Sequence, residues 1–370
     1  MSNKLYFASL FMLMLGSACT RTNPNETRQM VKELPFLEVA PTLIATDMPQ
    51  EKSQLQLSSF ASSVETIVLD TTEYGAPESL FKIVFSDDKD FLLLDAAQKR
   101  IYRYDSTGHF LNLIPGKDSK PQLINPVDFA YNPYNQHLFV LDNCLNMILE
   151  YTLSGDRVRT KMPLPFGAVR IGFVDGSHYC LYSHYSSEDS TSCYNYHITD
   201  TLFNETGRFE SYSRTGDLSI ELMQVFSQDQ GRLIGKSPRS NYLYHITADS
   251  ISPLYQVELN GDEKWLSEKD ADSLYEKRVN HRMNYCDRVF FADHYVITHY
   301  LIASNEGILY PKTIIYDRLT KETLSGDEFV CDLPGAEYEY FTSYHDNALY
   351  NFKHARNKQS NATIVVTHLK

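Results

Sequence analysis

The stretches FLLLDAAQKRIYRYDSTGHFLNL (91–113) and LFVLDNCLNMILEYTLSGDRVRT (138–160) decide the fold, because they are two copies of one pattern. At an offset of 47 residues, Asp95 falls on Asp142, and a tyrosine and a glycine further on coincide as well. Each copy contains two runs typical of β-strands joined by a polar loop, then a glycine-containing turn and a third run. An apolar run precedes each copy. Four short antiparallel strands form one blade of a β-propeller, so each copy predicts a blade.

The third strand of this pattern recurs along the chain, at 101–105, 148–152, 194–198, 242–246, 313–317 and 363–367. Its aligned positions are separated by 47, 45, 48, 72 and 50 residues, and are Tyr104, Tyr151, Tyr196, Tyr244, Tyr316 and Val366. Six copies predict six blades. The long interval contains residues 261–282, which are rich in helix-forming residues, so we predict a helical insertion between blades four and five.

The two ends of the repeat region complement each other. The chain ends just after the sixth copy, which therefore lacks a fourth strand, and residues 64–69 (VETIVL) form an unassigned β-type run before the first blade. We predict that this run completes blade six and closes the ring, so that no long edge is unpaired. A β-sandwich or two smaller β-domains is the alternative, but neither accounts for six spaced copies. The predicted fold is an all-β, six-bladed β-propeller closed by an N-terminal strand.

The first nineteen residues have the order of an export signal. Lys4 is followed by an apolar run at 5–15 and small residues before Cys19, as in a secretory signal peptide. Eleven apolar residues are too few to span a bilayer as a helix. The segment ending at Cys19 resembles a bacterial lipobox, although Gly16 stands where leucine is usual; an ordinary signal peptide with an incidental cysteine is the alternative. We predict a signal peptide at 1–18, a polar tether at 19–33 lipidated at Cys19, and a propeller over 34–370.

Composition narrows the class of protein. The chain contains 26 Tyr and 20 Phe but one Trp, and its net charge is −13. Tyrosine and phenylalanine favour strands, which agrees with an all-β fold. Proteins that bind nucleic acid need a basic face for the phosphates, so we expect no nucleic-acid partner.

The cysteines cannot all pair internally, and we expect no structural zinc site. Five cysteines follow Cys19, an odd number, and none has zinc-binding spacing. Cys180 and Cys193 flank an expected hairpin turn, where they form either a cross-strand disulfide or two half-buried thiols.

Residues 62–73, 82–114 and 125–133 resemble the NHL-like six-bladed propeller lipoproteins of Gram-negative bacteria. The matching positions within the first blade are Asp95, Ile101, Tyr104, Asp105 and Gly108. The resemblance is strong over 62–160 and weaker beyond, and residues 115–126 lack the glycine-rich stretch that the family often has there. Most of this family has no assigned function. The resemblance therefore implies the fold and a location in the cell envelope, in the outer membrane, rather than an activity.

Acidic residues at strand ends have two interpretations. Asp95 and Asp142 occupy equivalent positions, where a carboxylate either ligates a hard cation or caps a turn through the backbone. We favour the turn. Residues 87–90 (DDKD) lack the spacing of a calcium-binding EF-hand, and we predict a solvated hairpin tip between the first two strands.

Ligand binding is expected at one face of the propeller. Loops between strands two and three and loops between blades share a face at the mouth of the central channel, and such loops commonly bind ligands. Basic and aromatic residues there form a candidate rim for an anionic or glycan ligand, namely Lys117, Lys120, Arg239, His299, Tyr300 and Arg356. Three histidines expected on this face are metal-ligand or proton-transfer candidates, although a surface histidine usually has neither role: His184, His299 and His354.

These observations favour binding over catalysis. The sequence contains no Gly-x-Ser-x-Gly, P-loop or His-Glu-x-x-His motif, and we predict no catalytic residue, metal or cofactor. We predict a monomeric, non-catalytic scaffolding or binding propeller of the cell envelope with a protein or glycan partner. The alternative is a metal-dependent propeller enzyme of the lyase or lactonase type, with a site at the channel.

Overall fold

The structure is a computed structural model of the chain. It describes residues 31–370 except for 48–52, 73, 79, 117–122, 184–192, 213–223, 237–240, 261–284, 304–308, 337–340 and 355–360. Within these residues the fold is all-β, and the one helical element is the 3-10 turn η1 (Leu57–Ser59). The helical insertion predicted at 261–282 lies outside the described residues.

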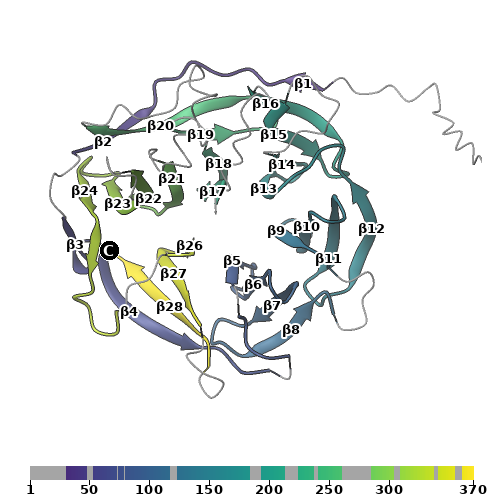
Figure 1. Ribbon diagram of the computed structural model, residues 1–370, viewed down its shortest axis with the longest axis horizontal. Coiled ribbons are helices and arrows are strands. Elements are labelled where there is room, and N and C mark those ends of the chain that lie inside the picture. The colour runs from purple at the N-terminus through teal and green to yellow at the C-terminus, as the bar shows by residue number, and fades with distance from the viewer. Residues whose placement is uncertain are drawn as a thin grey trace, which may run out of the picture. The chain divides into compact units, whose positions relative to one another are not determined.

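Six four-stranded antiparallel blades form a ring (Figure 1), and two of them gain a fifth, parallel strand at the outer edge. The first three blades are built in chain order from β5 (Leu80–Phe85), β6 (Phe91–Asp95), β7 (Arg100–Tyr104) and β8 (Phe110–Ile114); β9 (Pro126–Asn132), β10 (His137–Asp142), β11 (Met147–Thr152) and β12 (Arg157–Pro163); and β13 (Arg170–Asp175), β14 (His178–Tyr182), β15 (Cys193–Asp200) and β16 (Glu205–Tyr212). The predicted six-bladed propeller is confirmed.

Blades four to six follow the same order. They contain β17 (Phe226–Asp229), β18 (Arg232–Lys236), β19 (Tyr242–Ile246) and β20 (Ile251–Asn260); β21 (Tyr285–Phe291), β22 (Tyr295–Ala303), β23 (Leu309–Asp317) and β24 (Thr323–Gly326); and β26 (Ser343–His345), β27 (Ala348–Lys353), β28 (Thr363–Leu369) and β4 (Ala61–Val68). In blade six, β4 pairs antiparallel with β28 along its length, Val64 lying opposite Thr367. The run at 64–69 thus lies beside the last strand of the chain.

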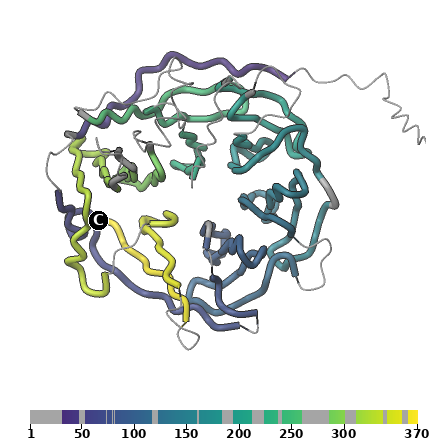
Figure 2. The backbone as a smooth tube through the Cα atoms, in the orientation of Figure 1, coloured from purple at the N-terminus to yellow at the C-terminus, as the bar shows by residue number. Residues whose placement is uncertain are grey.

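The segment before β4 runs along the outer strands of the propeller. β1 (Lys32–Glu33) pairs in parallel with β16, β2 (Thr42–Asp47) with β20, and β3 (Gln54–Gln56) with β25 (Glu328–Val330). Figure 2 shows this segment in purple outside β16 and β20. Residues 32 and 33, expected in the tether, therefore belong to the propeller. Outer strands offer unpaired backbone groups, and this segment, the N-terminal strap (32–56), satisfies part of them.

The turns after each third strand define the true repeat. In blades one to five, the backbone N–H of Asp105, Thr152, Asp200, Thr247 and Asp317 closes a turn across to the next strand. The equivalent preceding residues are Tyr104, Tyr151, Thr199, Ile246 and Tyr316, spaced by 47, 48, 47 and 70 residues. The predicted alignment was therefore wrong at Tyr196 and Tyr244, because it matched tyrosines rather than turns.

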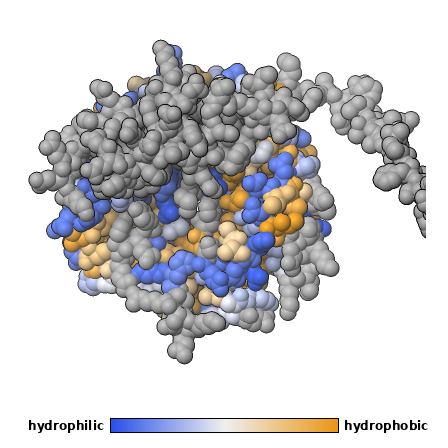
Figure 3. Space-filling model, in the orientation of Figure 1, coloured by the Kyte–Doolittle hydropathy of each residue, from blue (hydrophilic) through white to orange (hydrophobic). Residues whose placement is uncertain are grey.

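Apolar side chains are buried between neighbouring blades. Six buried clusters lie at the six junctions; the one between blades one and two, for example, joins Leu92 and Ile101 to Phe129 and Leu138. On the face shown in Figure 3 the described surface mixes hydrophobic and hydrophilic patches. Cys180 is a buried free thiol that lies opposite Ile198 on β15, so it does not form the disulfide considered with Cys193.

Candidate functional site: the central channel

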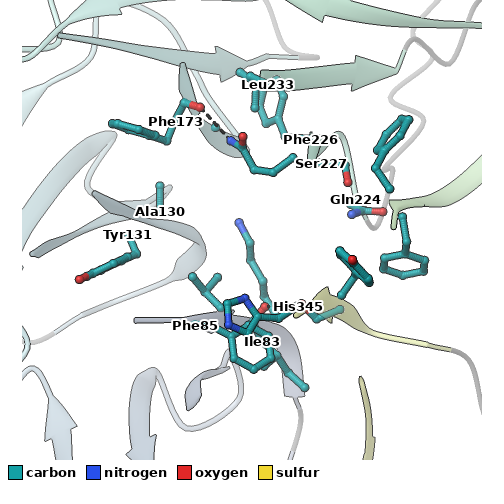
Figure 4. A pocket seen from close by; sticks show the side chains of 18 of the residues that line it. Ile83, Phe85, Ala130, Tyr131, Phe173, Gln224, Phe226, Ser227, Leu233 and His345 are labelled. Atoms are coloured by element: carbon teal, nitrogen blue, oxygen red, sulfur yellow. Dashed lines mark hydrogen bonds between the residues drawn. The ribbon is translucent and has the colours of Figure 1, made fainter. Parts of the chain in front are cut away.

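The innermost strands of all six blades enclose a cavity of about 420 Å³ (Figure 4). These strands are β5, β9, β13, β17, β21 and β26, and each contributes side chains to the wall. A cavity of this volume lies in the range that accommodates small ligands.

Aromatic residues line one end of the cavity. In each blade, one residue of the innermost strand lies opposite the start of the second strand, and these six residues occupy equivalent positions. Five are aromatic, and we name them the aromatic collar: Phe85, Tyr131, Phe173, Phe291 and Tyr344. The sixth is Gln228, whose Nε2 donates to the Phe173 carbonyl at 3.0 Å (Figure 4). All five line the cavity and pack in or against the clusters between blades; Tyr131 and Phe291 are buried there, whereas Phe85, Phe173 and Tyr344 are half-buried.

His345 lies beside the collar. Its ring stacks on Phe85, with centroids 4.2 Å apart and an interplanar angle of 9° (Figure 4). The Nε2 atom is buried and has no hydrogen-bond partner among the described residues. Burial lowers the pKa of His345, so the ring is neutral at pH 7. A neutral imidazole carries either a donor or an acceptor at this atom.

Charged side chains surround the other end of the cavity. Three residues before the collar on their strands, four of the six equivalent positions are charged, and we name them the charged ring: Lys82, Asp128, Arg170 and Arg288. At roughly 3.3 Å per residue, the ring lies about 10 Å from the collar along each strand. The channel wall thus has an aromatic end and a mainly cationic end.

Members of the charged ring also join neighbouring blades. The Lys82 ammonium contacts Asp128 Oδ1 at 2.7 Å and donates to the Phe129 carbonyl at 2.8 Å. Asp128 Oδ2 accepts the Ile171 N–H at 2.8 Å. Arg288 Nη1 donates to the Phe341 carbonyl at 2.6 Å. Each of these contacts joins a blade to the blade that follows it. The charged ring therefore also holds neighbouring blades together, and we call these contacts the interblade belt.

Lys236, at the end of β18, lies behind this end of the channel. It is buried, and its ammonium donates to the carbonyl oxygens of Cys286, at 2.8 Å, and of Asp287. Burial lowers the pKa of Lys236; the positive charges of Arg288 and Arg170 add to this effect, while Asp287 opposes it. Lys236 is therefore close enough to both arginines to share their electrostatic field.

The predicted rim is not supported where the structure describes it. His299 and Tyr300 are 3% and 1% exposed, and both lie within β22 rather than in a loop. The prediction placed these two residues in a loop that follows a short strand. In the structure, β22 and β23 are each nine residues long and contain this region. His299 Nδ1 lies 2.9 Å from Thr313 Oγ1 on the neighbouring strand. The remaining rim residues and one histidine candidate lie outside the described residues: Lys117, Lys120, Arg239, Arg356 and His184.

Other sequence candidates have clear positions. His354 is exposed just after β27. Residues 87–90 connect β5 to β6 as predicted, but Asp90 is buried in an ion pair with Arg103 instead of being solvated.

No cluster of three or more His, Cys, Asp or Glu side chains suited to a metal ion occurs among the residues that the structure describes. The collar was missed, although an aromatic residue near the end of the first strand in five of the six blades was a usable signal.

The equivalent aspartates cap turns, as favoured from the sequence. Asp95 is fully buried and accepts the N–H groups of Glu78 at 2.6 Å and Gln98 at 2.9 Å. Asp142, also fully buried, accepts three N–H groups from Ile124, Asn125 and Leu145 at 2.7 to 3.1 Å. Each carboxylate joins its own turn to the preceding interblade loop.

Replacing Asp142 with asparagine is expected to lower the free energy of unfolding by about 1–2 kcal/mol, because one N–H loses its oxygen acceptor. Urea unfolding measures this loss. Calcium or EDTA should not alter the melting temperature of the wild type. A calcium-dependent increase that the variant lacks would instead identify Asp142 as a cation ligand.

Comparison with known proteins places the chain in a family. The family model described as "Domain of unknown function (DUF4934)" matches residues 42–361. The chain belongs to this family. The match covers all or part of each of the six blades of this DUF4934 protein. No curated protein matches it.

Two solved structures share the fold of this DUF4934 protein. A "Putative exported protein" from Bacteroides fragilis is 15% identical with a TM-score of 0.73, and covers 89% of this chain and 100% of its own. A DUF4221 family member from Bacteroides vulgatus is 12% identical with a TM-score of 0.52, and covers 84% and 97%. These similarities confirm the propeller that the NHL-like resemblance implied, but not that family itself. No described helix of the DUF4934 protein is long and apolar enough to cross a membrane.

Proposed function

We propose that this chain is an exported, non-catalytic binding propeller that recognises a glycan in its central channel. The aromatic collar is the observation on which the proposal rests. Sugar rings present apolar C–H faces that pack on aromatic rings, while their hydroxyls need hydrogen-bonding groups at the edge. Half-buried aromatic surface and the exposed amide of Gln228 supply both in one cavity.

The charged groups of the channel favour binding over catalysis. A general acid or base must reach the reacting atom with a pKa near the working pH. Lys82, Asp128 and Arg288 instead hold backbone groups of the following blade. A metal-dependent lyase or lactonase-type propeller is the alternative. In the described ranges of the chain, no cluster of three or more potential metal-ligating side chains supports this alternative.

Replacing Phe173 with alanine is expected to weaken glycan binding about tenfold, since loss of one aromatic contact costs about 1.4 kcal/mol. Binding of a panel of neutral and acidic oligosaccharides to immobilised protein identifies the ligand, and calorimetry measures the change. The matched control is Tyr134→Ala, because Tyr134 is 75% exposed and packs on Phe173 from outside the cavity wall. Equal affinity of wild type and Phe173→Ala, or no binding across the panel, would contradict the proposal.

We also propose export through the signal peptide at 1–18 and lipid attachment at Cys19, with the monomeric propeller held at the outer membrane. The order of residues in the first nineteen positions supports this location. It agrees with the description of the Bacteroides fragilis protein as exported.

Cys19→Ala is expected to abolish labelling of the protein by an alkyne-tagged fatty acid in a Gram-negative host, because acylation needs the Cys19 thiol. Gel fluorescence after coupling to a dye measures the label. Cys144→Ala removes an exposed free thiol and serves as the control. Labelling that survives in Cys19→Ala would show that the protein is not anchored at this residue.

A further inference from the structure

Two glutamines of blade four line the channel, and a neighbouring blade fixes the orientation of each amide. Gln228 Nε2 donates to the Phe173 carbonyl of blade three at 3.0 Å. Gln224, just before β17, uses the opposite atom, since its Oε1 accepts the Val289 N–H of blade five at 2.9 Å. A carbonyl accepts and an N–H donates, so these backbone partners determine which atom of each amide is the nitrogen.

The Gln224 amide therefore presents its NH₂ group to the cavity. Figure 4 shows the nitrogen of this amide on the cavity side and its oxygen on the side of blade five. Gln224 is half-buried in the wall. No hydrogen bond to another described residue engages the nitrogen. The wall thus offers a hydrogen-bond donor at this position, while the oxygen of the same amide is already used.

The charged ring next to Gln224 also offers donors rather than acceptors. Val225 of blade four is equivalent to Lys82, so Gln224 adjoins the ring. The Lys82 ammonium has three N–H groups, and two of them bind Asp128 and the Phe129 carbonyl. Both oxygens of Asp128 are occupied, Oδ1 by Lys82 and Oδ2 by the Ile171 N–H. Because Asp128 balances the charge of Lys82, these donors suit a neutral acceptor.

A carbonyl group suits such a position better than a hydroxyl group. A hydroxyl that accepts from an N–H still has its own hydrogen, which needs an acceptor in turn, whereas an amide carbonyl only accepts. Apolar surface lies beside the donor, because Val225 and Phe226 follow Gln224 in the wall. An acetamido group combines a carbonyl with a methyl group and so matches both features.

We propose that the channel ligand is an N-acetylated sugar, and that Gln224 selects it by donating to the carbonyl oxygen of the acetamido group. This inference rests on the proposed function, because the aromatic collar holds a sugar ring. Gln224 lies four residues before Gln228 at the collar, a separation of at most about 14 Å in extended chain. A sugar of two rings can therefore place one ring at the collar and an acetamido group beside Gln224.

Calorimetry on the full chain tests this selection with cellobiose, N,N′-diacetylchitobiose and the deacetylated form of the latter. These disaccharides carry a hydroxyl, an acetamido or an ammonium group at carbon 2 of each ring. Diacetylchitobiose is expected to bind at least tenfold tighter than cellobiose, whereas the deacetylated sugar should show no gain, since an ammonium group only donates. Equal affinity for cellobiose and diacetylchitobiose, or tighter binding of the deacetylated sugar, would overturn the assignment.

Gln224→Glu isolates the donor. A carboxylate oxygen still accepts the Val289 N–H, but the second oxygen replaces the NH₂ group by an acceptor. The variant should lose the tenfold gain for diacetylchitobiose and keep its affinity for cellobiose, because a hydroxyl can donate to the carboxylate. Its melting temperature should stay near that of the wild type. A gain that survives in this variant would show that Gln224 does not select the acetamido group.

The matched control is Gln136→Glu, which adds the same charge at an exposed hairpin position of blade two outside the cavity wall. This control should keep the full gain for diacetylchitobiose. Gln224→Met removes the donor without adding a charge, and it should also lose the gain. If either Gln224 variant fails to fold, the other variant and the ligand comparison on the wild type still decide.

The two proposals fail in different ways. Cellobiose binding that Phe173→Ala weakens, without any gain from the acetamido groups, would keep the glycan function and refute the role of Gln224. Diacetylchitobiose binding that depends on Gln224 but not on Phe173 would keep the Gln224 assignment and refute the collar as the sugar site.

Discussion

Asp128→Ala is expected to lower the free energy of unfolding by about 3–4 kcal/mol, the largest effect of any single substitution considered for this protein. Asp128 is 2% exposed and joins three blades. Its two oxygens hold the Lys82 ammonium at 2.7 Å and the Ile171 N–H at 2.8 Å. Alanine would leave the Ile171 N–H buried without an acceptor and the ammonium with only one carbonyl. Urea unfolding at pH 7, followed by circular dichroism, measures the loss.

The matched control is Asp346→Asn, because Asp346 has a positive φ of 50° that asparagine tolerates better than alanine. Asp346 and Lys89 form an ion pair of 2.5 Å that also joins two blades, but their side chains are 61% and 62% exposed. Water solvates exposed charges, so the loss should stay below about 1 kcal/mol. Similar losses for the two variants would show that the interblade contacts of Asp128 stabilise the propeller no more than a surface ion pair does.

Acid is expected to destabilise the propeller through His299. Burial lowers the pKa of this imidazole to about 3, whereas an unfolded histidine titrates near 6.5. The stabilisation from keeping it neutral is complete above the unfolded pKa and is lost as pH falls, because the unfolded chain then binds the additional proton. Between pH 7 and pH 5 this group alone should remove about 2 kcal/mol from the free energy of unfolding, and more at lower pH.

His299→Gln isolates this contribution. The variant should lose about 2 kcal/mol less than the wild type between pH 7 and pH 5, since glutamine does not titrate. Other histidines contribute equally to both proteins and cancel in the difference. His294→Gln, at an exposed position, should behave like the wild type. An unchanged pH dependence in His299→Gln would mean that His299 is not the buried neutral group.

Features set by neighbouring residues were predictable from the sequence. The turns at Asp105 and Thr152 close through hydrogen bonds within a few residues, and Asp142 caps its own turn through Leu145. Such contacts leave a local pattern, so repeat number and strand order followed from spacing, and a turn-capping role was favoured for the aspartates. The position of the N-terminal strap could not be predicted in this way. Its parallel pairing with β16 and β20 links segments far apart in the chain, and the strap contains no repeat.

The site shows the same division. The sequence by itself predicted the six-bladed propeller and its central channel. Only the tertiary structure decided that Phe85, Phe173, Tyr344, Lys82 and Arg170 line one cavity. It also moved His299 from the predicted rim into the core. The physical reason is that the channel wall takes one strand from each blade. Which side chains meet there depends on the register of the sheets and the closure of the whole ring, not on neighbours in the chain.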